Sequence, residues 1–108
     1  MNFVKAAEIS EVPPGSKKVV TIQGKEILIV NTNGAYYAIG SRCPHERVDL
    51  SGGSLDGTVI TCPAHGAKFD VTTGKVVYRP KYWVYTLKVS DIPSYEVKVD
   101  GNNIMLGL

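Results

Sequence analysis

The placement of cysteine and histidine residues constrains this chain more than any other feature. The sequence holds two cysteines and two histidines, and all four lie in one segment. Cys43 and His45 form a C-x-H pair, and Cys62 and His65 form a C-x-x-H pair. Thiolate and imidazole groups are common ligands of zinc and of iron–sulfur clusters. Two short ligand pairs, separated by a glycine-rich stretch, therefore predict two loops that hold one metal centre.

Several readings of these four residues are open at this point. A disulfide between the cysteines is disfavoured by the lack of a secretory signal. Unrelated buried thiols with ordinary histidines, or a catalytic cysteine–histidine pair, would not require two such pairs so close together. Zinc sites usually pair like ligands within a loop, whereas each loop here supplies one sulfur and one nitrogen. This cross-pairing favours an iron–sulfur cluster with both sulfurs on one iron and both nitrogens on the other.

The composition limits the fold and the class of partner. A chain of 108 residues with 44% hydrophobic and 20% charged residues predicts one globular domain. No apolar run approaches the ~20 residues that span a bilayer, and the N-terminus lacks a signal peptide, so we expect a cytoplasmic protein without a membrane segment. The net charge of +2 and the scattered lysines argue against nucleic-acid binding.

The secondary-structure signals are those of an all-β protein. β-branched or alternating runs are separated by turn signals such as Gln23-Gly24 and Asn33-Gly34. The predicted strands cover residues 17–22, 25–31, 35–39, 58–62, 68–71, 75–78, 95–99 and the last residues of the chain. The best helical signal is one short turn near residues 6–9. Residues 41–66 are rich in Gly, Pro, Ser and Asp, which predicts a loop-built subdomain inside an antiparallel β base.

Three longer motifs run through the ligand segment. C-P-H-x₄-L-x₂-G begins at Cys43, G-x-L-x-G begins at Gly53, and C-P-x-H-G-x₂-F-D-x₂-T-G begins at Cys62. With these motifs the chain resembles the Rieske [2Fe–2S] family. Pro80 falls where that family has a proline loop over its cluster. The resemblance is specific in residues 43–74 and only general outside them.

The resemblance implies a fold and a ligand set. It implies the all-β Rieske iron–sulfur fold in a single domain, with an antiparallel base in residues 1–40 and 81–108 and an inserted cluster-binding subdomain in residues 41–80. It further implies one [2Fe–2S] cluster per chain, with Cys43 and Cys62 on the inner iron and His45 and His65 on the outer iron. The glycines at 52, 53 and 66 would let backbone N–H groups approach the cluster sulfurs.

The chain departs from the high-potential members of the family at four positions. Their loop disulfide is absent, because Arg47 and Ala64 stand at the cysteine positions. Their serine and tyrosine hydroxyls are replaced by Ala67 and Phe69. Hydrogen bonds to sulfur favour the reduced cluster, so we expect a potential near the low end of the Rieske range, about −150 mV.

The implied function is electron transfer. The family's oxygenase subunits add a second iron site that needs further histidines, and this chain has none beyond His45 and His65. We therefore expect a ferredoxin, not an enzyme, with a reductase and an acceptor such as an oxygenase as redox partners. Docking is expected around the two histidines, over Glu46, Arg47, Val48 and Ala64. A structural Cys₂His₂ zinc module and a cluster-based redox sensor are the alternatives.

Overall fold

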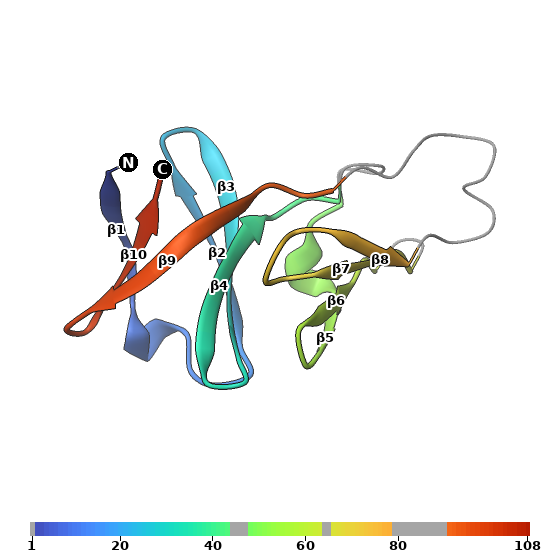
Figure 1. Cartoon of the computed structure of the whole chain (residues 1–108), viewed down its shortest axis with the longest axis horizontal. Helices are drawn as coiled ribbons and strands as arrows, with labels where there is room; N and C mark the ends of the chain where they lie inside the picture. The colour runs from blue at the N-terminus through green and yellow to red at the C-terminus, as the bar shows by residue number, and fades with distance from the viewer. Residues whose placement is uncertain (1, 44–47, 64–65, 79–90) are drawn as a thin grey trace.

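A computed structural model describes residues 2–43, 48–63, 66–78 and 91–108. Their strands form two antiparallel sheets, which lie beside each other in Figure 1. The six-stranded sheet has the order β1-β10-β9-β4-β3-β2, and the four-stranded sheet has the order β5-β6-β7-β8. The six-stranded sheet contains β1 (Phe3–Glu8), β2 (Lys17–Ile22), β3 (Lys25–Thr32), β4 (Ala35–Gly40), β9 (Ser94–Asp100) and β10 (Asn103–Gly107). The four-stranded sheet contains β5 (Ser54–Asp56), β6 (Val59–Thr61), β7 (Lys68–Asp70) and β8 (Val76–Tyr78).

Two tight turns set the register of the central strands. Gln23 and Gly24 have φ angles of 54° and 76°, and Asn33 and Gly34 have φ angles of 52° and 78°. Two successive positive φ angles are those of a type I′ turn, which matches the twist of a β-hairpin. The predicted hairpins β2–β3 and β3–β4 are therefore confirmed. Ile27 lies opposite Gly40 in the second hairpin, and Lys25 and Glu26 pair with Ile22 and Thr21 in the first, so every residue of β3 has a fixed partner.

The strand β3 is buried on both faces, which explains its unbroken apolar sequence. Ile27 and Ile29 contribute to one hydrophobic cluster, and Leu28 and Val30 contribute to another, as expected from the two-residue period of a strand. The base cluster consists of Val12, which follows η1, and of six residues of the six-stranded sheet: Ala7, Ile27, Ile29, Ala38, Ile104 and Leu106. The inter-sheet cluster joins the two sheets and consists of Leu28, Val30, Ile39, Cys43, Leu50, Ile60, Cys62, Ala67, Phe69, Val71 and Ile92.

The structure corrects one prediction and adds elements that the sequence did not reveal. The helical turn expected at residues 6–9 is wrong, because Phe3–Glu8 forms β1 and pairs with β10. A short 3-10 helix, η1 (Ile9–Glu11), follows the strand. The helix propensity of Lys5, Ala6 and Ala7 is thus overridden by strand pairing. The strand β5 and the 3-10 helix η2 (Leu50–Gly52) also lie in the stretch that was expected to be loops.

The all-β class is confirmed over the described ranges. No helix in this part of the chain is long and apolar enough to cross a membrane.

Candidate metal centre

Both cysteines lie in the inter-sheet cluster. Cys43 has no exposed surface and Cys62 is 1% exposed. Cys43 follows β4 of the six-stranded sheet, and Cys62 directly follows β6 of the four-stranded sheet. Neither cysteine forms a disulfide in the described structure, so the disulfide reading is wrong. The fold thus brings two thiols from separate sheets into one apolar environment.

Each cysteine begins a loop that is closed by the same backbone hydrogen bond. The N–H of Cys43 donates to the carbonyl oxygen of Val48 over 2.8 Å. The N–H of Cys62 donates to the carbonyl oxygen of Ala67 over 2.7 Å. In both cases the acceptor lies five residues after the cysteine. We name these segments the first cysteine loop (residues 43–48) and the second cysteine loop (residues 62–67), and each holds its cysteine at the equivalent position.

The two histidines lie outside the described residues. His45 falls in sequence within the first cysteine loop, and His65 falls within the second. Their role as ligands therefore stays a prediction. The other expected residues that lie outside the described ranges are Pro44, Glu46, Arg47, Ala64 and Pro80.

The stems below the two loops differ. The second loop grows out of the β6–β7 ladder, in which Thr61 pairs with Lys68 next to the loop. The first loop has an isolated bridge between Arg42 and Asp49. One residue further from the loop, Ser41 and Leu50 are joined by a hydrogen bond from the N–H of Leu50 to the carbonyl of Ser41 over 2.7 Å.

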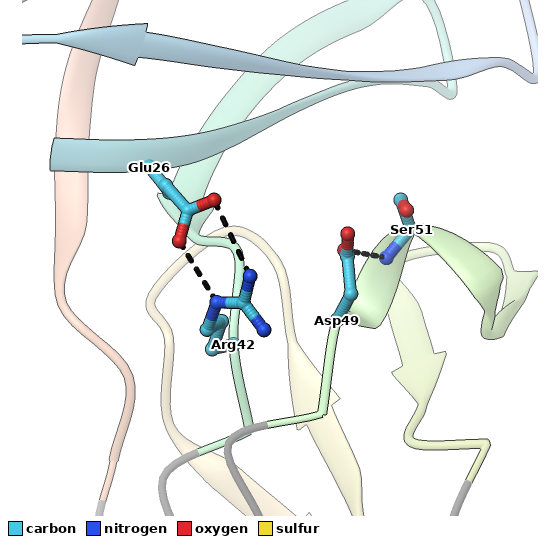
Figure 2. Close-up of polar contacts among 4 residues, drawn as sticks. All are labelled: Glu26, Arg42, Asp49 and Ser51. Atoms are coloured by element: carbon cyan, nitrogen blue, oxygen red, sulfur yellow. Dashed lines mark hydrogen bonds and ion pairs between the residues drawn. The ribbon is translucent and has the colours of Figure 1, made fainter.

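The 3-10 helix η2 follows the first loop directly and is capped by Asp49. The Asp49 carboxylate accepts a bond from the N–H of Ser51 over 2.8 Å (Figure 2). A backbone N–H at the start of η2, which has no partner within the helix, is thus hydrogen-bonded to a side chain from the stem of the loop.

Two of the expected glycines form backbone hydrogen bonds within the chain. The N–H of Gly53 donates to the carbonyl of Leu50, and the N–H of Gly66 donates to the carbonyl of Cys62. The approach of these two N–H groups to the cluster sulfurs therefore stays a prediction. Gly53 is required because a Cβ there would fall on the carbonyl oxygen of Thr61. Gly66 has a φ of 81°, a backbone conformation that favours glycine.

The two positions that lack hydroxyl groups are buried beside the cysteines. Ala67 and Phe69 have no exposed surface, and both belong to the inter-sheet cluster. Leu55 is partly buried and packs against the same cluster. These side chains therefore exclude water from the surroundings of the two thiols, as ordinary core residues do.

An ion pair that the sequence analysis missed joins Arg42, the residue before the first cysteine loop, to β3. The Glu26 carboxylate accepts bonds from Nε of Arg42 at 2.8 Å and from a terminal guanidinium nitrogen at 3.4 Å (Figure 2). The hydrogen bond and the charge of Arg42 lower the pKa of the Glu26 carboxyl, and Asp49 opposes this shift. The same interactions raise the pKa of Arg42. The Asn33-Gly34 turn was the available signal. Its register places Ile27 opposite Gly40, and the next residues, Glu26 and Ser41, are joined by a backbone hydrogen bond.

The donor set fits a metal–sulfur centre. Two buried thiols belong to one hydrophobic cluster, and the backbone of each cysteine bonds to the residue five positions later, across a segment that contains one histidine in sequence. Thiolates are soft ligands that suit zinc and iron–sulfur clusters. The geometry of the described residues admits both.

Comparison with known proteins favours the iron–sulfur cluster over zinc. The family model of the Rieske [2Fe-2S] domain matches residues 2–96. The biphenyl dioxygenase ferredoxin subunit of Pseudomonas sp. (strain KKS102) is 36% identical over 107 residues, which cover 98% of this chain and 92% of the relative.

Two solved structures agree in fold along nearly the whole chain. The ferredoxin of carbazole 1,9a-dioxygenase from Nocardioides aromaticivorans IC177 has a TM-score of 0.85 and 29% identity, and the match covers 98% of this chain and 97% of that one. A chain in the complex of reduced oxygenase and oxidized ferredoxin in carbazole 1,9a-dioxygenase has a TM-score of 0.82 and 28% identity, covering 96% and 91%.

Proposed function

This chain belongs to the Rieske [2Fe–2S] domain family, and from that premise we propose that it is a ferredoxin that carries one electron at a time from a reductase to a terminal oxygenase. The observation that carries the proposal is the equivalent placement of Cys43 and Cys62, both buried, in two closed loops. One [2Fe–2S] cluster per chain is the cofactor. We therefore prefer the ferredoxin hypothesis over the two alternatives, a structural zinc module and a redox sensor.

We propose that Cys43, His45, Cys62 and His65 hold the cluster. When bound, the cluster supplies a one-electron couple. The two thiolates would hold it from the apolar side, where Phe69 and Leu50 exclude water. A dry environment of this kind lowers the local dielectric around a metal centre. The histidines would complete the ligand set from the remaining positions of the two cysteine loops.

The two sheets correspond to two structural parts of the domain. We propose a base in residues 1–40 and 81–108 and a cluster-binding subdomain in residues 41–80. In support, all strands of the six-stranded sheet lie outside residues 41–80, and all strands of the four-stranded sheet lie within them. Partner proteins would dock around His45 and His65. We propose that this transfer takes place in the cytoplasm, without nucleic acid or membrane partners.

The chain is an electron carrier and not a catalytic subunit. Its relatives are named as ferredoxin components of dioxygenase systems. The cluster would use both histidines of the sequence, which leaves none for a second iron site.

The test is an analysis of protein expressed with iron and purified without oxygen. We expect a red-brown protein with two irons and two acid-labile sulfides per chain, and an electron paramagnetic resonance signal after one-electron reduction. Stoichiometric zinc without labile sulfide would instead establish a structural zinc module. A second measurement adds a flavin reductase and an oxygenase and follows product formation, which is expected to depend on this protein.

A further inference from the structure

The first cysteine loop has a side-chain anchor outside its own stem. The Glu26 carboxylate lies on β3 and accepts two hydrogen bonds from Arg42, the residue directly before Cys43. The backbone carbonyl of Glu26 also accepts a bond from the N–H of Ser41 over 3.1 Å. One residue of the rigid sheet therefore holds two consecutive residues that lead into the loop.

Glu26 is well placed to act as an anchor. It lies next to Ile27, which is fully buried, and the hairpin register fixes it opposite the exit of β4. The planar guanidinium group of Arg42 matches a carboxylate with two parallel bonds, which restricts its orientation more than a single contact would. The pair is about half exposed, with side-chain exposures of 48% for Arg42 and 44% for Glu26.

The same pair sets the charge beside the loop. The backbone of Arg42 forms the isolated β-bridge with the backbone of Asp49, and the Asp49 charge also acts on Arg42. Glu26, Arg42 and Asp49 together carry one net negative charge. The Arg42 guanidinium is the charged group that immediately precedes Cys43 in the chain.

We propose that Glu26 is a positioning residue for the electron-transfer centre. Through Arg42 it holds Cys43 in the position where its N–H bonds to the carbonyl of Val48, and it keeps a cation that is paired with a carboxylate directly before Cys43 in the chain. The inference rests on the proposed function, because it assumes that Cys43 is a cluster ligand. It assigns to the base sheet a direct part in the stability and the potential of the centre.

The experiment compares three variants with the full-length, cluster-loaded parent. Glu26→Gln removes the carboxylate charge at constant shape. The double variant Glu26→Arg with Arg42→Glu restores an ion pair with reversed orientation. The matched control is Glu11→Gln, which removes the exposed pair of Glu11 with Lys18 at 3.5 Å on the base. The readouts are hydrogen exchange by mass spectrometry, the rate of iron removal by a chelator, and the reduction potential.

Glu26→Gln is expected to raise exchange in residues 41–50 and the rate of iron removal by about two- to fivefold, as for the loss of an exposed ion pair. Residues 59–70 should not change. The reversed pair should restore both rates, yet it should lower the potential, because position 42 is then negative. A purely structural contact would not change the potential in this direction.

Unchanged exchange in residues 41–50 of Glu26→Gln would overturn the inference. An equal effect of Glu11→Gln would also overturn it, because the response would then be general. Failure of the reversed pair to restore either rate would show that the ion pair does not hold the loop. A parent protein that contains no iron or sulfide would refute the proposed function instead, and hydrogen exchange in that protein would still report whether Glu26 holds the loop.

Discussion

The two cysteine loops share one closing bond but differ in what supports them. The second loop is the end of a regular ladder, in which Ile60 pairs with Phe69 and Thr61 pairs with Lys68. The first loop has one isolated bridge, at Arg42 and Asp49, and depends on contacts with other elements. Equivalent ligand positions can therefore be built on unequal scaffolds. We expect the second loop to keep its shape by itself, and the first to need the base sheet, the second loop and the cluster.

The segment that follows the first cysteine loop packs against the start of the second loop at two adjacent glycines, Gly52 and Gly53. The Gly53 backbone packs against the carbonyl of Thr61, the residue before Cys62. Gly52 faces Pro63, since a Cβ on Gly52 would lie 4.0 Å from the proline Cγ. The two flanks of the first loop are thus connected to different elements. The flank after the loop packs closely against the backbone before Cys62, and the flank before the loop is joined to β3 by the ion pair.

The largest expected effect comes from removing a thiol. Cys43→Ser or Cys62→Ser should abolish cluster assembly, because a hydroxyl is a poor substitute for a thiolate ligand. Visible absorption and iron content measure this loss. Hydrogen exchange then tests the comparison directly. In both variants residues 48–53 should exchange faster than in the parent, whereas β6 and β7 should retain most of their protection.

Two results would contradict this expectation. A serine variant that keeps the parent spectrum would show that the substituted cysteine is not a ligand. Equal loss of protection in both loops would show that the β6–β7 ladder is not independently stable.

The next largest effect is expected from a substitution that disturbs the close packing of Gly53 against Thr61. Gly53→Ala should destabilise the protein by about 3 kcal/mol, the upper part of the usual range for overpacking, because its Cβ meets a backbone oxygen that cannot rotate away. The free energy of unfolding in urea measures this change. The matched control is Gly52→Ala, whose Cβ would make only an ordinary contact with Pro63.

We expect Gly52→Ala to change the free energy of unfolding by less than about 0.5 kcal/mol, as for most surface substitutions. If the two alanine variants are equally stable, the close approach between the loops does not restrict position 53.

The sequence was sufficient for the parts of the fold that are set by local rules. Gln23-Gly24 and Asn33-Gly34 are turn signals that can be recognised locally, so the two long hairpins were predicted, and the φ angles then identified the turn type. The strand β1 was missed because its residues favour helix locally, and it is a strand only through its pairing with β10. The strand β5 has three residues, which is too short to show a two-residue period.

The candidate site also contains features that could be predicted from local sequence and features that depend on tertiary packing. The ligand motif is local in sequence, so Cys43 and Cys62 could be singled out before their burial was known. The Glu26–Arg42 pair joins residues 16 positions apart and depends on the register of a hairpin, which a motif does not contain. The role of Gly53 depends on a backbone oxygen from another strand. Contacts of this kind follow from tertiary packing and not from composition or spacing.

A third prediction concerns tuning, which we assign to the second loop. Ala67→Ser with Phe69→Tyr places two hydroxyl groups in the inter-sheet cluster beside the cysteines. Each bond to a cluster sulfur would favour the reduced state, because that state carries more negative charge. The potential should rise by roughly 60–200 mV if part of each bond's strength differs between the redox states. Protein-film voltammetry measures the shift.

The control is Ala38→Ser, which adds a hydroxyl to the base cluster at a residue that is 2% exposed. Its potential should match that of the parent. The metal-free double variant should also be less stable than the metal-free parent, since a buried hydroxyl without a partner costs about 1–3 kcal/mol. A normal cluster with an unchanged potential would show that these hydroxyls do not set it.

The smallest expected effect is the acid response of the first loop. Arg42 lowers the pKa of the Glu26 carboxyl by its hydrogen bond and its charge. A lowered folded-state pKa adds stability above the unfolded-state value, about 4.3, and this stability is lost as the pH falls through the folded-state pKa. The parent should therefore protect residues 41–50 better than Glu26→Gln at neutral pH, and the difference should disappear below about pH 4.

Glu11 also has a lowered pKa, through a hydrogen bond from the Glu8 N–H, so Glu11→Gln serves as the control. Its acid-sensitive difference should lie in the base, near η1. A difference in residues 41–50 that persists unchanged at low pH would mean that the carboxylate charge of Glu26 is not what supports the first loop, and that its backbone bond to Ser41 is sufficient.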